Sequence, residues 1–134
     1  MLSNGRIIAS TPTLYTYEPQ TMVSTGIQRY DQFIPAATTI MRGAILDQPF
    51  GAGTVHGYRS PDSPLIWLRD HVYQMQGARY FDSDMISAID AFASLQYPDG
   101  SFPDFLPRAP WADTAYRTPV EADVEFLFVQ GVYQ

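Results

Sequence analysis

The chain of 134 residues is long enough for about one domain, and its 46% apolar and 14% aromatic residues can build a core. All eight basic residues are arginine and fourteen residues are acidic, so the net charge is −6 and no basic cluster is available for nucleic acid. The sequence has no cysteine, which excludes disulfides and thiolate metal sites, and no apolar run of about 18 residues, which argues against a membrane-spanning helix.

Residues 1–30 are rich in Thr, Pro, Tyr and Ser without a sustained helical period, which predicts an extended segment or a short pair of strands. They also lack the charged start and apolar run of an export signal, so we expect a cytoplasmic protein. Between Asp31 and Leu46 apolar residues recur every three or four positions, which predicts a first helix. Residues 47–66 are rich in glycine and proline, and we expect a long irregular loop there.

Three further helices follow in the predicted order. The second covers about residues 68–78, and a third begins after Asp82 or Ser83, either of which can cap it, and ends near Gln96. The turn-forming residues 97–103 open a second long loop. A fourth helix begins at Thr118-Pro119-Val120-Glu121, which has a cap, a proline in the first position and a Glu three residues after the cap.

The fourth helix is apolar on most sides, which is typical of a helix buried all round. The sequence stops at Gln134, directly after this apolar stretch and without a helix-stop residue. We therefore expect the chain to be incomplete, with residues 31–134 forming the first two helical hairpins of a larger domain.

The loop lengths predict how the helices are directed. A short link makes the second and third helices antiparallel, so the second and fourth run parallel and both long loops lie at their amino ends. The side chains that this arrangement brings to one end are Tyr58, Trp67, Arg69, Asp70, His71, Asp99, Asp104, Trp111, Asp113, Arg117, Glu121 and Asp123.

These residue types fit a carbohydrate. Carboxylates and arginine bind sugar hydroxyls, aromatic rings cover the apolar face of the sugar, and cleavage of a glycosidic bond normally needs two carboxyl groups. His56 and His71 are fifteen residues apart and have no metal-binding spacing, so we expect neither a metal nor a cofactor.

Three motifs carry a resemblance to a known family. The segments 64–71 (PLIWLRDH), 99–105 (DGSFPDF) and 119–123 (PVEAD) resemble the six-hairpin glycosidases, which include glucoamylases, trehalases and glycogen-debranching enzymes. The resemblance covers residues 31–134. It implies an all-α fold, part of an (α/α)6 toroid, and an inverting glycoside hydrolase that acts on an α-linked glucoside or a related oligosaccharide.

The resemblance also implies roles for individual residues. Arg69 and Asp70 would contact the hydroxyls of the terminal sugar, and we take Asp70 and Glu121 as the candidate catalytic pair. In many family members the general acid and base lie on later hairpins, in which case this part of the chain binds sugar without cleaving it. The expected partners are a carbohydrate and the remainder of the catalytic domain. The substrate-binding candidates are Trp67, Arg69, His71, Tyr58, Asp104, Trp111, Arg117 and Asp123.

Other interpretations stay open at this point. Asp70 could be a helix-start carboxylate paired with Arg69, Glu121 could belong to a capping box, and His71 could be a buried, hydrogen-bonded ring. The same architecture also serves sugar epimerases, lyases and non-catalytic carbohydrate-binding toroids. A purely structural module of helical hairpins is a third possibility.

Overall fold

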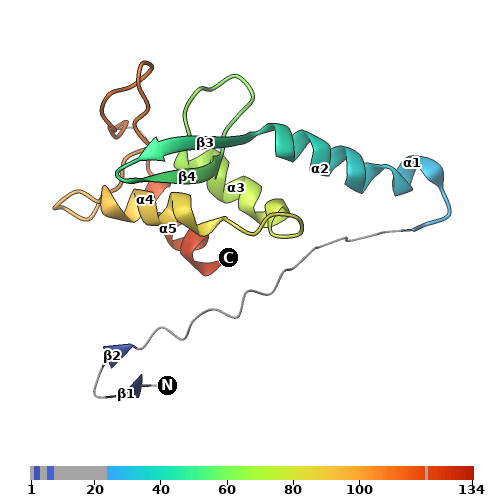
Figure 1. Ribbon diagram of the computed structural model, residues 1–134, viewed down its shortest axis with the longest axis horizontal. Helices are drawn as coiled ribbons and strands as arrows, with labels where there is room; N and C mark the ends of the chain where they lie inside the picture. Colours follow the sequence, from blue (N-terminus) through green and yellow to red (C-terminus); the bar gives the residue numbers. More distant parts are fainter. Residues whose placement is uncertain (1, 4–5, 8–23, 120) are drawn as a thin grey trace.

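The computed structural model describes residues 2–3, 6–7, 24–119 and 121–134 (Figure 1). At the amino end, β1 (Leu2–Ser3) pairs antiparallel with β2 (Arg6–Ile7), a short strand pair as predicted for residues 1–30; the prediction for residues 8–23 lies outside the described residues. The chain then forms α1 (Gln28–Asp31), α2 (Phe33–Gly43), β3 (Ile45–Phe50), β4 (Gly53–Tyr58), α3 (Leu68–Ala78), α4 (Ile86–Ser94) and α5 (Val124–Tyr133).

The prediction of an all-α toroid is wrong, because residues expected to form an irregular loop form the β3–β4 hairpin. The two strands pair antiparallel from Ile45 opposite Tyr58 to Phe50 opposite Gly53. Gly51 and Ala52 make the two-residue turn, and Gly51 adopts the left-handed conformation (φ +56°) that such a turn requires. The described chain is therefore a small mixed α/β fold.

Glycine and proline have specific places in this hairpin rather than marking a loop. Pro49 lies in a two-stranded sheet, where each strand is an edge and a missing backbone donor is tolerated. Gly57 is required by close packing, because a Cβ there would lie 2.8 Å from Ile66 Cδ1. Because glycine and proline are typical of loops, these two residues led to the prediction of a loop in place of the strands.

The predicted helices are partly confirmed. The second predicted helix is α3 at the expected bounds, whereas the first is shorter than expected because Ile45 already belongs to β3. The third predicted helix, α4, begins later than expected, at Ile86, and neither Asp82 nor Ser83 is its cap. Just before it, Asp84 Oδ1 accepts a hydrogen bond from the Ser87 N–H at 3.0 Å. Asp82 instead contacts the hairpin, as described below.

The last helix differs most from its prediction. It begins at Val124 rather than at residue 118, and the Thr118 side chain does not cap it. Leu127 is buried on its inner face, whereas Phe126 is 78% exposed, so the helix is not buried all round in this chain. The outer face carries an exposed apolar stripe of Phe126, Val129, Val132 and Tyr133.

The core lies around α3, which contacts β4, α2, α4 and α5 (Figure 1). Packing is close where α5 approaches α3 and α4: a Cβ on Gly131 would lie 2.6 Å from Ile89 Cδ1 and 3.0 Å from Val72 Cγ2. The main buried cluster consists of Val55, Ile66, Leu68, Val72, Met75, Ala88, Ile89, Ala91, Phe92, Phe102, Leu106, Val124 and Leu127.

Within the described parts of the chain, every helix is too short or too polar to cross a bilayer.

Candidate functional site

Backbone pairing holds the amino end of α3 in place. The Leu106 N–H donates to the Ile66 carbonyl at 3.0 Å, and the Leu68 N–H donates to the Asp104 carbonyl at 2.8 Å. Trp67, the residue before the helix, forms a β-bridge with Phe105, and the two rings lie 5.0 Å apart. The first turn of α3 is thereby attached to the segment that follows the Asp99–Gly100 turn.

Asp104 connects this end of α3 to the segment before α5. It is only 2% exposed, and its Oδ2 accepts a hydrogen bond from the Thr118 N–H. Its own N–H donates to the Tyr116 carbonyl at 3.0 Å. A hydrogen bond from a backbone N–H to a buried carboxylate is strong. Asp104, which was predicted to bind substrate, therefore has a structural role: it attaches the segment before α5 to the segment that pairs with the start of α3.

Arg117 orients the residues that precede α5. Its guanidinium forms an ion pair with Glu125 and donates to the Glu121 carbonyl oxygen at 2.9 Å. The two contacts link the loop to the first turn of α5. Arg117 therefore positions Glu121.

The amino ends of α3 and α5 meet at Arg69. Its Nη2 lies 2.7 Å from Glu121 Oε2 and 2.7 Å from Asp123 Oδ1, and its Nε lies 3.2 Å from Asp123 Oδ2. Asp70 follows Arg69 on α3. We call Arg69, Asp70, Glu121 and Asp123 the Arg69 rim. The capping-box role is therefore wrong for Glu121, whose side chain binds Arg69 instead.

The carboxyl groups of the rim have different electrostatic surroundings. The hydrogen bond with Asp123 holds the pKa of Arg69 above its usual range, and in return Arg69 lowers the pKa of Asp123. Burial raises the pKa of Asp70, and the charges of Asp62 and Glu121 act in the same direction. The rim thus combines a carboxyl that holds its proton more tightly with one that releases it more readily.

His71 and Tyr58 are among the predicted binding residues that do not belong to this rim. His71 is fully buried: its Nδ1 accepts the Tyr58 N–H at 3.1 Å, and its Nε2–H donates to the Met85 carbonyl at 3.1 Å. Tyr58 is fully buried too, and its hydroxyl donates to Asp82. Assigning these side chains to substrate binding is wrong, because helix geometry turns His71 inward although Asp70 lies next to it.

The two tryptophans lie on the segments that flank the start of α3. Trp67 is half-buried and donates its Nε1–H to Ser63 Oγ at 2.8 Å. Trp111 is exposed, and the Arg108 guanidinium lies 4.5 Å from its ring centroid. Arg108 also donates to the Pro64 carbonyl at 2.7 Å, which ties the Trp111 loop to the segment before α3.

The structure also contains a polar cluster that sequence reasoning missed. His56 lies between Asp47 and Asp82, and Tyr58 bonds to the same Asp82 oxygen as His56. We call these four residues the His56 cluster. Asp47 is directly opposite His56 in the hairpin register, so recognition of the hairpin would have paired them. No sequence signal indicates Asp82, 26 positions further along the chain.

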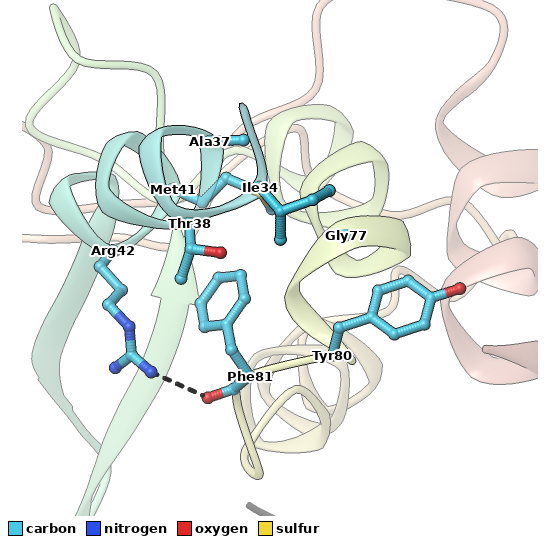
Figure 2. A pocket seen from close by; sticks show the side chains of 8 residues that line it. All are labelled: Ile34, Ala37, Thr38, Met41, Arg42, Gly77, Tyr80 and Phe81. Carbon is cyan, nitrogen blue, oxygen red and sulfur yellow. Dashed lines mark hydrogen bonds between the residues drawn. The ribbon is translucent and has the colours of Figure 1, made fainter. Parts of the chain in front are cut away.

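A pocket lies at the other end of α3, between α2 and the α3–α4 link (Figure 2). Its volume is about 480 Å³ and its walls are mainly apolar. The Arg42 guanidinium at its edge donates to the Phe81 carbonyl at 3.3 Å. No carboxyl group lines this pocket, so it lacks the chemistry predicted for a glycosidase. The lining residues are Ile34, Ala37, Thr38, Met41, Arg42, Gly77, Tyr80 and Phe81.

Across the described ranges, no group of three or more His, Asp or Glu side chains has metal-binding geometry. The chain matches no known family model, no curated protein and no solved structure. The assignment of a function therefore depends on the geometry of the Arg69 rim.

Proposed function

We propose that the Arg69 rim binds a saccharide and that the protein is a glycoside hydrolase acting on an α-linked glucoside or a related oligosaccharide. One observation carries the proposal: Arg69 is held in a defined orientation by Glu121 and Asp123, two carboxylates from a distant segment, while its side chain stays 41% exposed. An oriented cation and carboxylates that remain open to solvent suit a ligand rich in hydroxyl groups.

The rim offers both kinds of hydrogen-bonding partner that a sugar needs. The guanidinium donates to hydroxyl oxygens, and the carboxylates of Glu121 and Asp123 have lone pairs left to accept hydroxyl protons. These three side chains are already paired, so little side-chain entropy is lost when a ligand binds. Exposed Trp111, on a loop tied to the same end of α3, could cover the apolar face of a sugar ring.

The different carboxyl environments support hydrolysis as the reaction. Asp70, whose pKa is raised by burial, suits the general acid that protonates the departing glycosidic oxygen. Glu121, ion-paired with Arg69, suits the carboxylate that takes a proton from the attacking water. The inverting outcome is an expectation from the resemblance alone.

Calorimetric titration with maltooligosaccharides tests binding, and the release of reducing ends from the same sugars tests hydrolysis. We expect saturable binding that Asp70→Asn weakens about tenfold, because a hydrogen bond between the Asp70 carboxyl group and the sugar is lost. Asp90→Asn is the matched control, because Asp90 is an exposed carboxylate on α4 outside the rim.

The outcomes separate the alternatives. Binding and hydrolysis that both depend on Asp70 support the full proposal. Binding without release of reducing ends leaves a carbohydrate-binding module and removes the hydrolase. The absence of saturable binding in the wild-type chain would mean that the rim is a structural ion-pair network joining α3 to α5.

A further inference from the structure

His56 bridges two parts of the fold through its two ring nitrogens. Nδ1 lies 2.7 Å from Asp47 Oδ1 on β3, and Nε2 lies 2.8 Å from Asp82 Oδ2 on the α3–α4 link. The ring itself is on β4 and is largely buried. A single side chain therefore connects the outer strand of the hairpin to the link between two helices.

The protonation state of His56 determines how many of these two contacts can be hydrogen bonds. An ionised carboxylate only accepts hydrogen bonds, and a neutral imidazole has a single N–H to donate. With neutral His56, one of the two short contacts would set a nitrogen lone pair against a carboxylate oxygen. With both carboxylates ionised, both contacts are hydrogen bonds only when the ring carries two protons.

The second proton belongs on His56 rather than on Asp82. The Asp82 carboxylate also receives the Tyr58 hydroxyl and, at 3.1 Å, the Asp84 N–H. Although burial opposes its ionisation, the hydrogen bonds from Tyr58 and His56 hold the pKa of Asp82 below its ordinary value. Three hydrogen bonds stabilise the ionised form of the Asp82 carboxylate, so the second proton is on His56.

We propose that His56 is a proton-dependent tie: as an imidazolium it couples β3 to the α3–α4 link, and when it loses a proton it releases Asp47. The released partner is Asp47 because its side chain is 62% exposed and water can replace the contact. Asp82 is only 11% exposed, so its carboxylate keeps the remaining N–H.

The charges around the ring favour the imidazolium. Burial acts against the charged form, but the hydrogen bonds to Asp82 and Asp47 outweigh it and raise the pKa of His56 above 6.5. On α4, uncharged Ser87 bonds to the His56 backbone at 3.0 Å. The charged and titratable groups on the surrounding elements are Tyr58 on the same strand, Asp47 on β3, Asp82 and Asp84 on the link, His71 on α3 and Arg42 on α2. Asp90, the acidic residue of α4, is exposed and has no contact with the ring.

The sign of the effect follows from linkage. A histidine whose folded pKa exceeds its unfolded value stabilises the fold fully below the unfolded pKa, and this contribution disappears as the pH rises through the folded pKa. We therefore expect the cross-strand contact between His56 and Asp47 to weaken as the pH rises above 6.5, with faster hydrogen exchange in β3 after correction for the intrinsic rate.

The test is a pH titration of the two imidazole rings by long-range ¹H–¹⁵N NMR, since the chain has only two histidines. We expect the midpoint of His56 to lie above 6.5, so that the doubly protonated ring is the major form at pH 6.5. Asp47→Asn should lower the midpoint and remove the pH dependence of β3 exchange, whereas Asp90→Asn should change neither. Asp47 is exposed, so its variant is not expected to disturb folding.

Two results would overturn the tie. One is a wild-type His56 that titrates at or below 6.5. The other is a midpoint and a β3 exchange profile that are the same in Asp47→Asn as in the wild type.

Discussion

The Arg69 rim and the His56 cluster are both networks of charged side chains, but they lie in different surroundings. The rim joins two helix ends at the surface, and its arginine is 41% exposed. The His56 cluster includes Tyr58, which is fully buried, and Asp82, which is 11% exposed. Water competes for every contact in the rim and for few in the cluster, so we expect the rim to contribute mainly to binding and the cluster mainly to stability.

Truncation of Tyr58 to alanine should cost the most stability. The ring is fully buried, stacks on His71 at 5.9 Å and donates its hydroxyl to Asp82. We expect Tyr58→Ala to lower the free energy of unfolding by roughly 3–5 kcal/mol, measured by urea denaturation. Tyr58→Phe keeps the packing and removes only the hydroxyl, so it should cost about 1 kcal/mol. Equal losses of stability in the two variants would contradict the prediction that ring packing contributes more than the hydroxyl hydrogen bond.

Acid should destabilise the fold through His71, which accepts a hydrogen bond from the backbone of Tyr58 in the His56 cluster. Burial lowers the pKa of His71 to about 4, so the folded state prefers the neutral ring. Its contribution is fully present above the unfolded value of 6.5 and is lost as the pH falls toward 4. The loss amounts to roughly 3 kcal/mol over that interval.

His71→Gln tests the pH-dependent contribution of His71 to stability, because glutamine also offers an acceptor and a donor group but does not titrate. Unfolding of both proteins in urea, measured at several pH values, should give a steeper decline for the wild type below pH 6.5. Parallel declines would show that carboxyl groups, and not His71, govern the acid sensitivity. A steeper decline in the wild type would mean that the two histidines act in opposite directions: His56 stabilises the fold when charged, and His71 when neutral.

The sequence predicted the rim better than the cluster, and the reason is local. Arg69, Asp70, Glu121 and Asp123 lie at or just before helix starts, where apolar periodicity and loop lengths indicate which ends meet. The cluster depends on the register of a hairpin that was not predicted, because Pro49 and Gly57 are residue types typical of loops. It also depends on Asp82, which was predicted to cap a helix. The inward direction of His71 follows from its place on α3 and could have been predicted from the position of Leu68 and Val72 on the same helix.

The capping box at Thr118 shows a different limit of sequence reasoning. The motif is present, but the Thr118 N–H is bound by buried Asp104 and the Glu121 side chain is drawn to Arg69. A tertiary ion pair therefore replaced a local hydrogen bond, and the helix begins at Val124. Neither partner is close in sequence, so propensity alone could not have shown the competition.

Removal of the Arg69 charge should separate binding from stability. Exposed ion pairs contribute about 0.2–1 kcal/mol each, so Arg69→Met should lower the free energy of unfolding by about 1 kcal/mol, far less than Tyr58→Ala. It leaves Glu121 and Asp123 facing each other without their cation, so the pKa of Asp123 should rise toward its ordinary value, measurable by ¹³C NMR of the carboxyl carbons. Arg79→Met, at the carboxyl end of the same helix, is the matched control and should leave the Asp123 titration unchanged. A loss of stability as large as that of Tyr58→Ala would make the rim a structural element of the fold, because a network needed to hold α3 to α5 cannot be treated as a surface kept free for a ligand.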